Sequence, residues 1–328
     1  MTTTGKGMLF THAEAQLRLR VRQMRWEAEG VVSVHLETLD GSKLPAWQPG
    51  AHLDLHLPGV VTRQYSLCGD AQDLTTWRIA VLREADSRGG SAAVHDTLRP
   101  GDLVDVVGPR NNFPLEESPE YVFIAGGIGI TPLLPMVESV ATSGAVWSLR
   151  YGGRTRSSMA FVHELERHGS RVEIRPHDEL GLLDLDEALG EPRPGVRVYC
   201  CGPEALLAAV EHRCDAWPRG TLHIERFAAK PSEGACTDEE AEFAVELARS
   251  GCTITVPAGM AILEAVEAAG IEPPSSCREG ICGTCETAVL SGTPDHRDSL
   301  LSDEERAANT TMLICVGRAL SERLVIDL

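Results

Sequence analysis

Four cysteines in the last quarter of the chain have the spacing of a plant-type [2Fe–2S] ligand set, Cys-x4-Cys-x2-Cys followed by a distant fourth cysteine. The four are Cys277, Cys282, Cys285 and Cys315. Small residues within the loop, Gly280, Gly283 and Thr284, leave backbone N–H groups free to bond the sulfurs, and glycine adopts positive φ at little cost. The spacing therefore predicts a chain that carries single electrons.

Two other uses of these cysteines fit the sequence less well. A structural zinc site usually pairs two Cys-x2-Cys knuckles, or one knuckle with histidines, and no second pair lies nearby. A disulfide framework is compatible with an even total of 10 cysteines, but residues 1–15 carry one lysine and no apolar stretch of secretory length. We therefore expect reduced cysteines and a cytoplasmic protein.

Composition limits the possible partners. The chain has 328 residues, room for two or three domains, and a formal net charge of −18. No segment reaches the apolar length that spans a bilayer. Because such a surface repels nucleic acid and anionic lipid, we expect neither as a partner. The acidic charge is either a solvated face or a surface that steers a basic protein partner.

The apolar pattern changes twice along the chain. Leu53, Leu55 and Leu57 alternate with polar residues in a turn-rich region, which predicts a small antiparallel β-barrel over residues 16–115. Over residues 116–227, apolar strands alternate with helical stretches. That rhythm predicts a parallel sheet covered by helices on both faces.

The remaining segments complete the predicted organisation. Residues 1–15 are expected to form an N-terminal tail, and residues 228–242, which are polar and charged, predict a linker. Residues 243–328 predict a compact α+β module that contains the cysteine loop, with Cys315 on a strand over residues 312–316.

A flavin is suggested by Arg63-Gln64-Tyr65-Ser66, placed where a strand leaves the barrel. Tyr65 can lie against an isoalloxazine ring, Ser66 can bond the ring edge and Arg63 can neutralise a phosphate. Taken alone, this tetrapeptide is also typical of an ordinary surface strand.

A second segment, Arg88-Gly89-Gly90-Ser91, precedes a helical stretch over residues 92–98. Glycines allow the backbone to approach an anion, and Ser91 is expected to cap a helix whose N–H groups face it. The two segments together predict a phosphorylated flavin, and a plain loop-to-helix cap is the alternative.

A nucleotide-type turn, Gly-Gly-Ile-Gly-Ile-Thr-Pro, follows the apolar strand predicted over residues 121–125. Pro132 suits the first helical position, but it replaces the third glycine of the strict dinucleotide fingerprint. The candidate contacts of this turn are Gly126, Gly127, Gly129 and Thr131.

Two further groups lie at the predicted carboxyl edge of the same sheet, where open parallel sheets bind ligands. Arg154 and Arg156 can hold a 2′-phosphate or the adenosine side of a nucleotide, so they do not distinguish NADH from NADPH. Cys201-Gly202-Pro203 forms another turn between a strand and a helix.

Taken in order, Arg-x-Tyr-Ser, Gly-Gly-x-Gly-Ile-Thr-Pro, Cys-Gly-Pro-Glu and the cluster motif resemble the phthalate dioxygenase reductase and vanillate O-demethylase reductase family. The resemblance covers residues 16–328. It implies a flavin-binding barrel of the ferredoxin-reductase type, an NAD(P)H-binding α/β domain and a β-grasp ferredoxin domain. It also implies FMN rather than FAD and favours NADH over NADPH.

The resemblance assigns roles by position. It places Ala80, Val81 and Leu82 beside the flavin ring, and Thr131 and Cys201 near the nicotinamide. Phe227 matches an aromatic residue that covers the flavin face, although a core phenylalanine ending a strand is an equal alternative. The residues expected to act in catalysis are Ser66, Thr131, Cys201 and Phe227.

These motifs predict a reductase that passes hydride from NADH to the flavin and single electrons through the cluster to an external acceptor. Plant-type clusters lie near about −400 mV, low enough to reduce a Rieske centre. We therefore expect a separate Rieske-type oxygenase acting on an aromatic or similar compound as the partner. The alternatives are a cytochrome P450 or diiron oxygenase as acceptor, or a redox-sensing protein without turnover.

Overall fold

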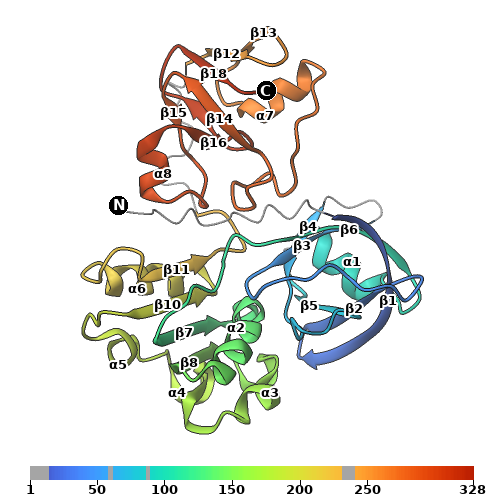
Figure 1. Cartoon of the computed structure of the whole chain (residues 1–328), viewed down its shortest axis with the longest axis vertical. Helices are drawn as coiled ribbons and strands as arrows, with labels where there is room; N and C mark the ends of the chain where they lie inside the picture. The colour runs from blue at the N-terminus through green and yellow to red at the C-terminus, as the bar shows by residue number, and fades with distance from the viewer. Residues whose placement is uncertain (1–14, 58–61, 86–88, 231–240) are drawn as a thin grey trace, which may run out of the picture.

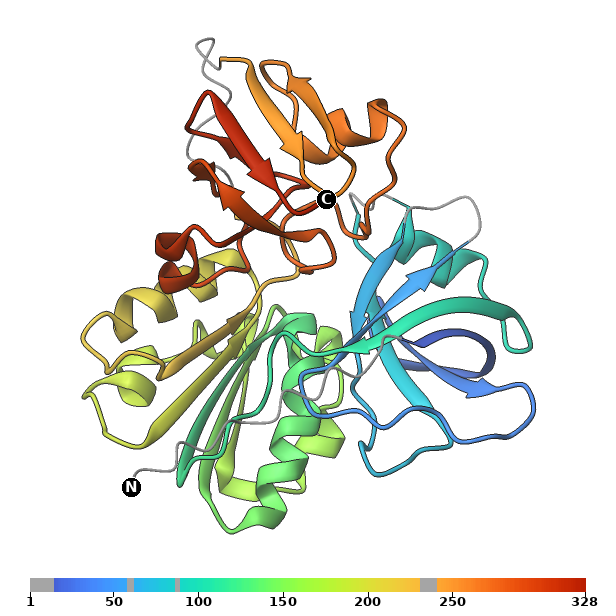
Figure 2. The ribbon, with the colours of Figure 1, turned by 45° about the horizontal axis from the view of Figure 1, so that its top comes forward.

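The structure is a computed structural model, and it describes residues 15–57, 62–85, 89–230 and 241–328. Three groups of strands, each with its own apolar core, surround a common centre (Figures 1 and 2). No helix in these ranges is both long and apolar enough to cross a bilayer. The predicted fold class, an antiparallel barrel, a parallel α/β sheet and an α+β module, is confirmed.

The first unit is a six-stranded antiparallel sheet in the order β4-β3-β6-β1-β2-β5. Its strands are β1 (Ala15–Ala28), β2 (Val31–Thr38), β3 (His52–His56), β4 (Arg63–Ser66), β5 (Trp77–Leu82) and β6 (Leu103–Arg110). A bridge between Leu67 and Ile79 joins the two edges, so the sheet curls into a barrel around buried side chains such as Trp77. Asp54, which the alternating pattern would leave outside, is buried.

The second unit is a parallel sheet in the order β11-β10-β7-β8-β9. Its strands are β7 (Glu120–Gly126), β8 (Val146–Gly153), β9 (Val172–Pro176), β10 (Val196–Cys201) and β11 (Leu222–Glu225). The chain starts at the central strand β7 and builds outward to each side, which creates a topological switch at the carboxyl ends of β7 and β10. Ligands bind open α/β sheets at such points.

Helices cover both faces of this parallel sheet. They are α2 (Ile130–Ser143), α3 (Val162–Glu166), α4 (His177–Leu180), α5 (Leu185–Leu189) and α6 (Glu204–Cys214), with short 3₁₀ turns η1 (Gly127–Gly129), η2 (Arg156–Ser158) and η3 (Gly169–Arg171). Apolar residues of α2 pack with Phe123 on one face, and those of α5 and α6 pack with Ile124 on the other. Adjacent strand residues point to opposite faces, which explains the continuous apolar run of β7.

The third unit is a mixed sheet in the order β13-β12-β18-β14-β16, with the small pair β15-β17 beside it. Its elements are β12 (Phe243–Leu247), β13 (Cys252–Val256), α7 (Ile262–Ala268), β14 (Glu286–Ser291), β15 (Pro294–Asp295), α8 (Asp303–Ala308), β16 (Thr311–Leu313), β17 (Arg318–Ala319) and β18 (Arg323–Ile326). Cys315 does not lie on a strand as predicted, because β16 ends at Leu313 and the chain turns there.

Two local expectations about helix starts are wrong. Helix α1 (Gly90–Asp96) is preceded by Gly89 in the left-handed conformation, with φ 96° and no side-chain cap, so Ser91 lies inside the first turn. Its hydroxyl instead accepts the backbone N–H of Glu84 at 3.3 Å. Pro132 is the third residue of α2 rather than the first, because η1 runs directly into the helix at Ile130.

The barrel is fastened to the parallel-sheet unit by Arg78 on β5. Its guanidinium donates two hydrogen bonds to the Glu164 carboxylate on α3, at 2.9 and 3.1 Å, and also bonds the Cys68 carbonyl. It lies 4.8 Å from the centre of the Phe161 ring. This ion pair should stabilise the contact more than an ordinary surface ion pair does. Its two hydrogen bonds form a fork, the arginine is largely buried, and its guanidinium contacts an aromatic ring.

Replacing Glu164 with glutamine should therefore loosen the two units. The uncharged amide weakens a hydrogen bond to a partly buried guanidinium, and we expect a loss of about 1–2 kcal/mol in unfolding free energy. Urea unfolding followed by fluorescence checks this. Glu187→Gln, at an exposed partner of Arg150, is the control, and equal effects of the two substitutions would contradict the assignment.

Candidate functional site

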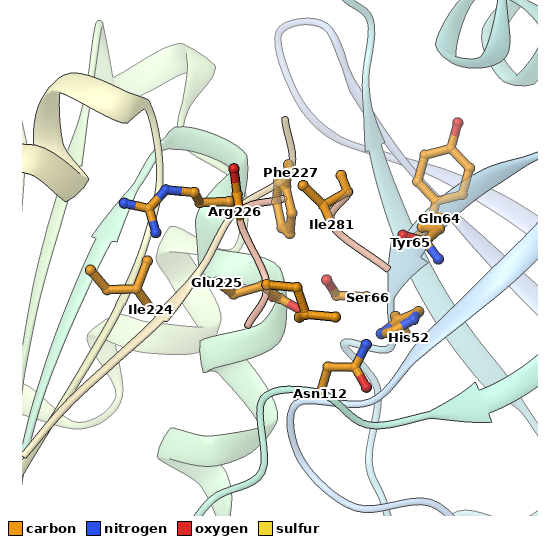
Figure 3. A pocket seen from close by; sticks show the side chains of 12 residues that line it. His52, Gln64, Tyr65, Ser66, Asn112, Ile224, Glu225, Arg226, Phe227 and Ile281 are labelled. Atoms are coloured by element: carbon orange, nitrogen blue, oxygen red, sulfur yellow. The ribbon is translucent and has the colours of Figure 1, made fainter. Parts of the chain in front are cut away.

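Two adjoining pockets lie where the three units meet, and they share Gln64, Tyr65, Ser66 and Phe227. One of them gathers ten of the residues predicted from the sequence to bind cofactor. These are Arg63, Gln64, Tyr65, Ser66, Ala80, Val81, Leu82, Ser91, Thr131 and Phe227. The other pocket adds Ile281 of the cysteine loop, and Figure 3 shows Ile281 close to Phe227.

Strands β4 and β5 are the two edges of the barrel sheet, which is why their side chains reach the pocket. Tyr65 packs partly against the barrel core, and burial raises the pKa of its phenol to about 12. The ring therefore stays neutral at physiological pH. Ser66 is buried at the pocket wall, with its neighbour Gln64 held by Asp54.

One corner of this pocket combines an arginine with a glycine turn, and Glu84 lines the same pocket. A Cβ on Gly90 would lie 2.4 Å from the Arg63 Cγ, so the arginine packs directly over the first turn of α1. Gly89 supplies the left-handed turn that brings this backbone under the guanidinium. Arg88, predicted to contribute here, lies outside the described residues.

Two turns meet at the topological switch with no room for side chains. A Cβ on Gly129 would lie 2.3 Å from the Cys201 carbonyl oxygen, and one on Gly126 would lie 2.7 Å from Pro203 Cδ. Gly202 packs back against Gly126. A Cβ on Gly202 would lie 3.0 Å from the nearest atoms of Gly126. Gly127 instead has φ 55° and open space around it. This arrangement suits the approach of a nucleotide to bare backbone.

Three other predicted side chains, those of Cys201, Arg154 and Arg156, lie outside the two pockets. Cys201 is fully buried and lines neither pocket, and burial raises the pKa of its thiol. Thr131 lines a pocket, but its hydroxyl donates to the Ile128 carbonyl at 2.9 Å. Arg154 and Arg156 follow β8 outside both pockets, and Arg156 pairs with Glu166.

Phe227 is not a core residue that ends a strand. Its residue surface is 41% exposed, two positions beyond the end of β11. It belongs to both pockets, and in Figure 3 it lies beside Ile281 of the cysteine loop. An aromatic ring this exposed at the junction of two pockets has room to cover or uncover a planar ligand.

Glu225 is a site residue that the sequence analysis missed. It lines the pocket, and its Oε2 atom is buried with no hydrogen-bond partner among the described residues. Burial raises the pKa of this carboxyl to about 8, so it holds a proton at neutral pH and can donate a hydrogen bond. The signal available in the sequence was its position at the end of a strand, two residues before Phe227.

The cysteine loop presents its sulfurs to backbone donors. The N–H of Glu279 donates to the Cys277 sulfur at 3.3 Å, and the N–H of Thr284 donates to the Cys282 sulfur at 3.4 Å. Left-handed residues, including Gly280 at φ 69°, make the tight turns that this requires. These donors suit thiolates, which carry negative charge.

The four sulfurs lie in two linked pairs, Cys277 with Cys282 and Cys285 with Cys315, joined by a contact between Cys277 and Cys315. Nowhere in the described ranges do three or more ligand side chains suit a single metal ion. Two pairs of thiolates fit a cluster in which each of two irons takes two cysteines.

Comparison with known proteins supports the same assignment. The family of the 2Fe-2S iron-sulfur cluster binding domain matches residues 245–320. The chain is 45% identical to phenoxybenzoate dioxygenase subunit beta of Ectopseudomonas oleovorans over 96% of this chain and 98% of that protein. The predicted family resemblance is confirmed.

Two solved structures are similar over 95% of this chain. Phthalate dioxygenase reductase, a modular structure for electron transfer from pyridine nucleotides to [2Fe–2S], has 38% identity, a TM-score of 0.71 and 98% of its length covered. An intact type IV self-sufficient cytochrome P450 monooxygenase has 42% identity and a TM-score of 0.89, but this chain spans 41% of its length.

Glu225 makes stability depend on pH. The pKa of this carboxyl is 4.5 in the unfolded chain and about 8 in the folded protein. At a pH between these two values, folding takes up a proton. The free energy of unfolding should therefore fall as the pH rises from 5 to 8. One pKa unit corresponds to about 1.4 kcal/mol, so the total reaches a few kcal/mol at most.

Glu225→Gln should flatten this decline, because the amide does not titrate. Unfolding free energies measured by urea titration between pH 5 and pH 8 check this, with the exposed Glu117→Gln as control. Parallel pH profiles for the wild type and Glu225→Gln would show that burial does not hold this proton.

Proposed function

We propose that this chain, which belongs to the phthalate dioxygenase reductase family, takes hydride from NADH onto FMN and delivers single electrons through its [2Fe–2S] cluster to a Rieske-type oxygenase. The observation that carries the proposal is the meeting of Ser66, Phe227 and Ile281 around one pocket. These residues come from the barrel, the parallel-sheet unit and the cysteine loop. A flavin there would adjoin both its electron donor and its electron acceptor.

The flavin would lie against β4 and β5. Tyr65 offers a neutral ring, Ser66 a hydroxyl at the pocket wall, and Arg63 with the Gly89–Gly90 turn a cradle for the phosphate. A bound flavin supplies the conversion between hydride transfer and single-electron transfer, which side chains cannot perform. The residues of the chain hold the ring, exclude water and keep Glu225 neutral beside it.

The nucleotide would reach the same pocket across Gly127, with Thr131 at its edge and Phe227 in the way. Phe227 must move for a nicotinamide to stack on the ring, and its exposure permits this movement. Cys201 acts from behind the turn, where its backbone packs against Gly129. Its backbone therefore shapes the site, and its buried thiol does not reach the ligand.

Ion pairs made by two arginines near the carboxyl edge of the parallel sheet support NADH over NADPH. Arg156 pairs with Glu166, and Arg175 at the end of β9 donates to Glu173 at 3.0 Å. A 2′-phosphate would have to compete with these carboxylates, which costs about 0–1 kcal/mol for pairs this exposed. Arg154, two positions before Arg156, is exposed. FMN is supported by the family to which the chain belongs, and the corner beside Arg63 fits the phosphate of either flavin.

A cytochrome P450 is the second candidate acceptor. It is supported by the likeness to part of a self-sufficient P450 monooxygenase, in which a region of this fold shares the polypeptide with the P450. The relatives covered along nearly their whole length, including the phenoxybenzoate dioxygenase subunit, favour a separate oxygenase. Purified acceptors of each class, supplied with NADH and the chain, distinguish the two.

Anaerobic titration with NADH should bleach flavin and cluster absorbance together, with one flavin and two irons per chain. Mass spectrometry of the released flavin should identify FMN. NADPH titrated in parallel should bind more weakly. A protein that contains FAD, or that prefers NADPH, would overturn that part of the proposal, and one without a flavin would overturn all of it.

Cys282→Ser should separate the two halves of the reaction, because it removes one cluster thiolate next to the pocket. We expect NADH-dependent reduction of cytochrome c to be lost, while reduction of ferricyanide, which accepts electrons from flavin directly, continues. Cys252→Ser, which lies outside the cluster loop, is the matched control. Unchanged cytochrome c reduction in Cys282→Ser would contradict a route through the cluster.

A further inference from the structure

A chain of side-chain hydrogen bonds runs from the proposed flavin strand to the cysteine loop. Gln64 on β4 donates to Asp54 Oδ1 at 2.9 Å, and Arg110 at the end of β6 bonds Asp54 Oδ2 at 3.3 Å. The other arm of Arg110 donates to the Thr284 hydroxyl oxygen at 2.8 Å. That oxygen lies 3.2 Å from the Cys282 sulfur. None of these contacts is used in the reaction described above.

The central residues of this series of hydrogen bonds are largely buried. The Asp54 and Arg110 side chains are 4% and 12% exposed, and each carboxylate oxygen of Asp54 has its own donor. A buried ion pair contributes little net stability compared with an apolar pair of the same volume, so its value lies in fixed geometry. The planar guanidinium can point one arm at Asp54 and another at Thr284 only in a narrow range of orientations.

The direction of the last hydrogen bond follows from proton count. Cysteine ligates iron as a thiolate, so the sulfur of Cys282 can only accept. The Thr284 oxygen accepts from Arg110, which leaves its one hydroxyl proton to be donated to that sulfur. Arg110 thus turns the Thr284 hydroxyl toward the cluster ligand.

A second contact fixes the same loop. Asn112, two residues beyond β6, donates to the Cys282 carbonyl at 2.9 Å. A Cβ on Gly283 would lie 3.5 Å from the Asn112 amide nitrogen, so backbone and side chain are closely packed here. The end of β6 therefore holds the loop at Cys282 itself and at Thr284, two residues further on.

We infer that Arg110 is a positioning residue, which sets the potential of the cluster and its coupling to the flavin by orienting the Thr284 hydroxyl onto the Cys282 sulfur. Hydrogen bonds to cluster sulfurs stabilise the more negative, reduced state and raise the reduction potential. Anchoring through Asp54 to Gln64 ties this donor to the strand that lines the flavin pocket. The inference rests on the proposed function, because it requires a cluster and a flavin at these places.

The first test is on Thr284, in the full-length protein with flavin and cluster. Thr284→Val keeps the shape of the side chain and removes the hydroxyl, so the cluster potential should fall in a spectroelectrochemical titration. The electron paramagnetic resonance signal of the reduced cluster should also shift. Thr284→Ser, which keeps the hydroxyl, should restore both. A wild-type potential in Thr284→Val would overturn the inference.

The second test is a double-mutant cycle between Arg110 and Thr284. Arg110→Gln should lower the potential, and its effect should shrink in a Thr284→Val background if arginine acts through the hydroxyl. Arg20→Gln, at an exposed ion pair with Glu37 on the same sheet, is the matched control. An effect of Arg110→Gln that is equal in both backgrounds would show action through charge alone and overturn the inference.

Rapid mixing with NADH under anaerobic conditions completes the test. Flavin reduction should keep its wild-type rate in Thr284→Val, whereas reduction of the cluster should slow by about tenfold or more, a usual size for loss of a partner that orients a metal ligand. Equal slowing of both steps would contradict the inference. A wild type without flavin, cluster or NADH oxidation would instead refute the proposed function, so the two failures are distinguishable.

Discussion

Direct backbone contact between two glycine turns fixes the centre of the molecule. Gly129 packs on the Cys201 carbonyl, and Gly126 packs on Gly202 and Pro203, at distances that admit no side chain. This contact sets the spacing of β7 and β10 at their carboxyl ends, and β11 pairs with β10 in register beside them. The position of Glu225, and of Phe227 beyond it, therefore depends on residues whose only contribution is the absence of a Cβ.

The sequence predicted the parts of this site that are local. Glycine turns after apolar strands, the Cys-x4-Cys-x2-Cys loop and the Arg63–Ser66 strand each carry their signal within a few residues. Alternation and periodicity then gave the three units, because burial of one strand face or of both leaves a readable pattern. Errors arose at the ends of elements, because α1 begins one residue before Ser91 and the chain turns at Cys315 instead of continuing β16.

Long-range contacts were beyond the sequence analysis. Arg110 and Thr284 are 174 positions apart, and Arg110 and Asp54 are 56 apart, so no local pattern links them. Asp54 stood in an alternating strand as an expected surface residue, yet it is buried because its carboxylate satisfies Gln64 and Arg110. The sequence also could not predict that the thiol of Cys201 is inaccessible. The turn that packs the Cys201 backbone against Gly129 also buries the thiol.

The contacts that the cluster unit makes with the other two units differ in burial and therefore in strength. Toward the parallel-sheet unit, Arg219 pairs with Glu304 while 92% and 65% of their side chains are exposed, and such pairs contribute about 0–1 kcal/mol. Toward the barrel, Arg110 and Asn112 bond the loop itself in partly buried surroundings. Screening by salt weakens the first contact far more than the second. The cluster loop therefore takes its position from the end of β6, where Arg110 is linked through Asp54 to Gln64 in the wall of the pocket.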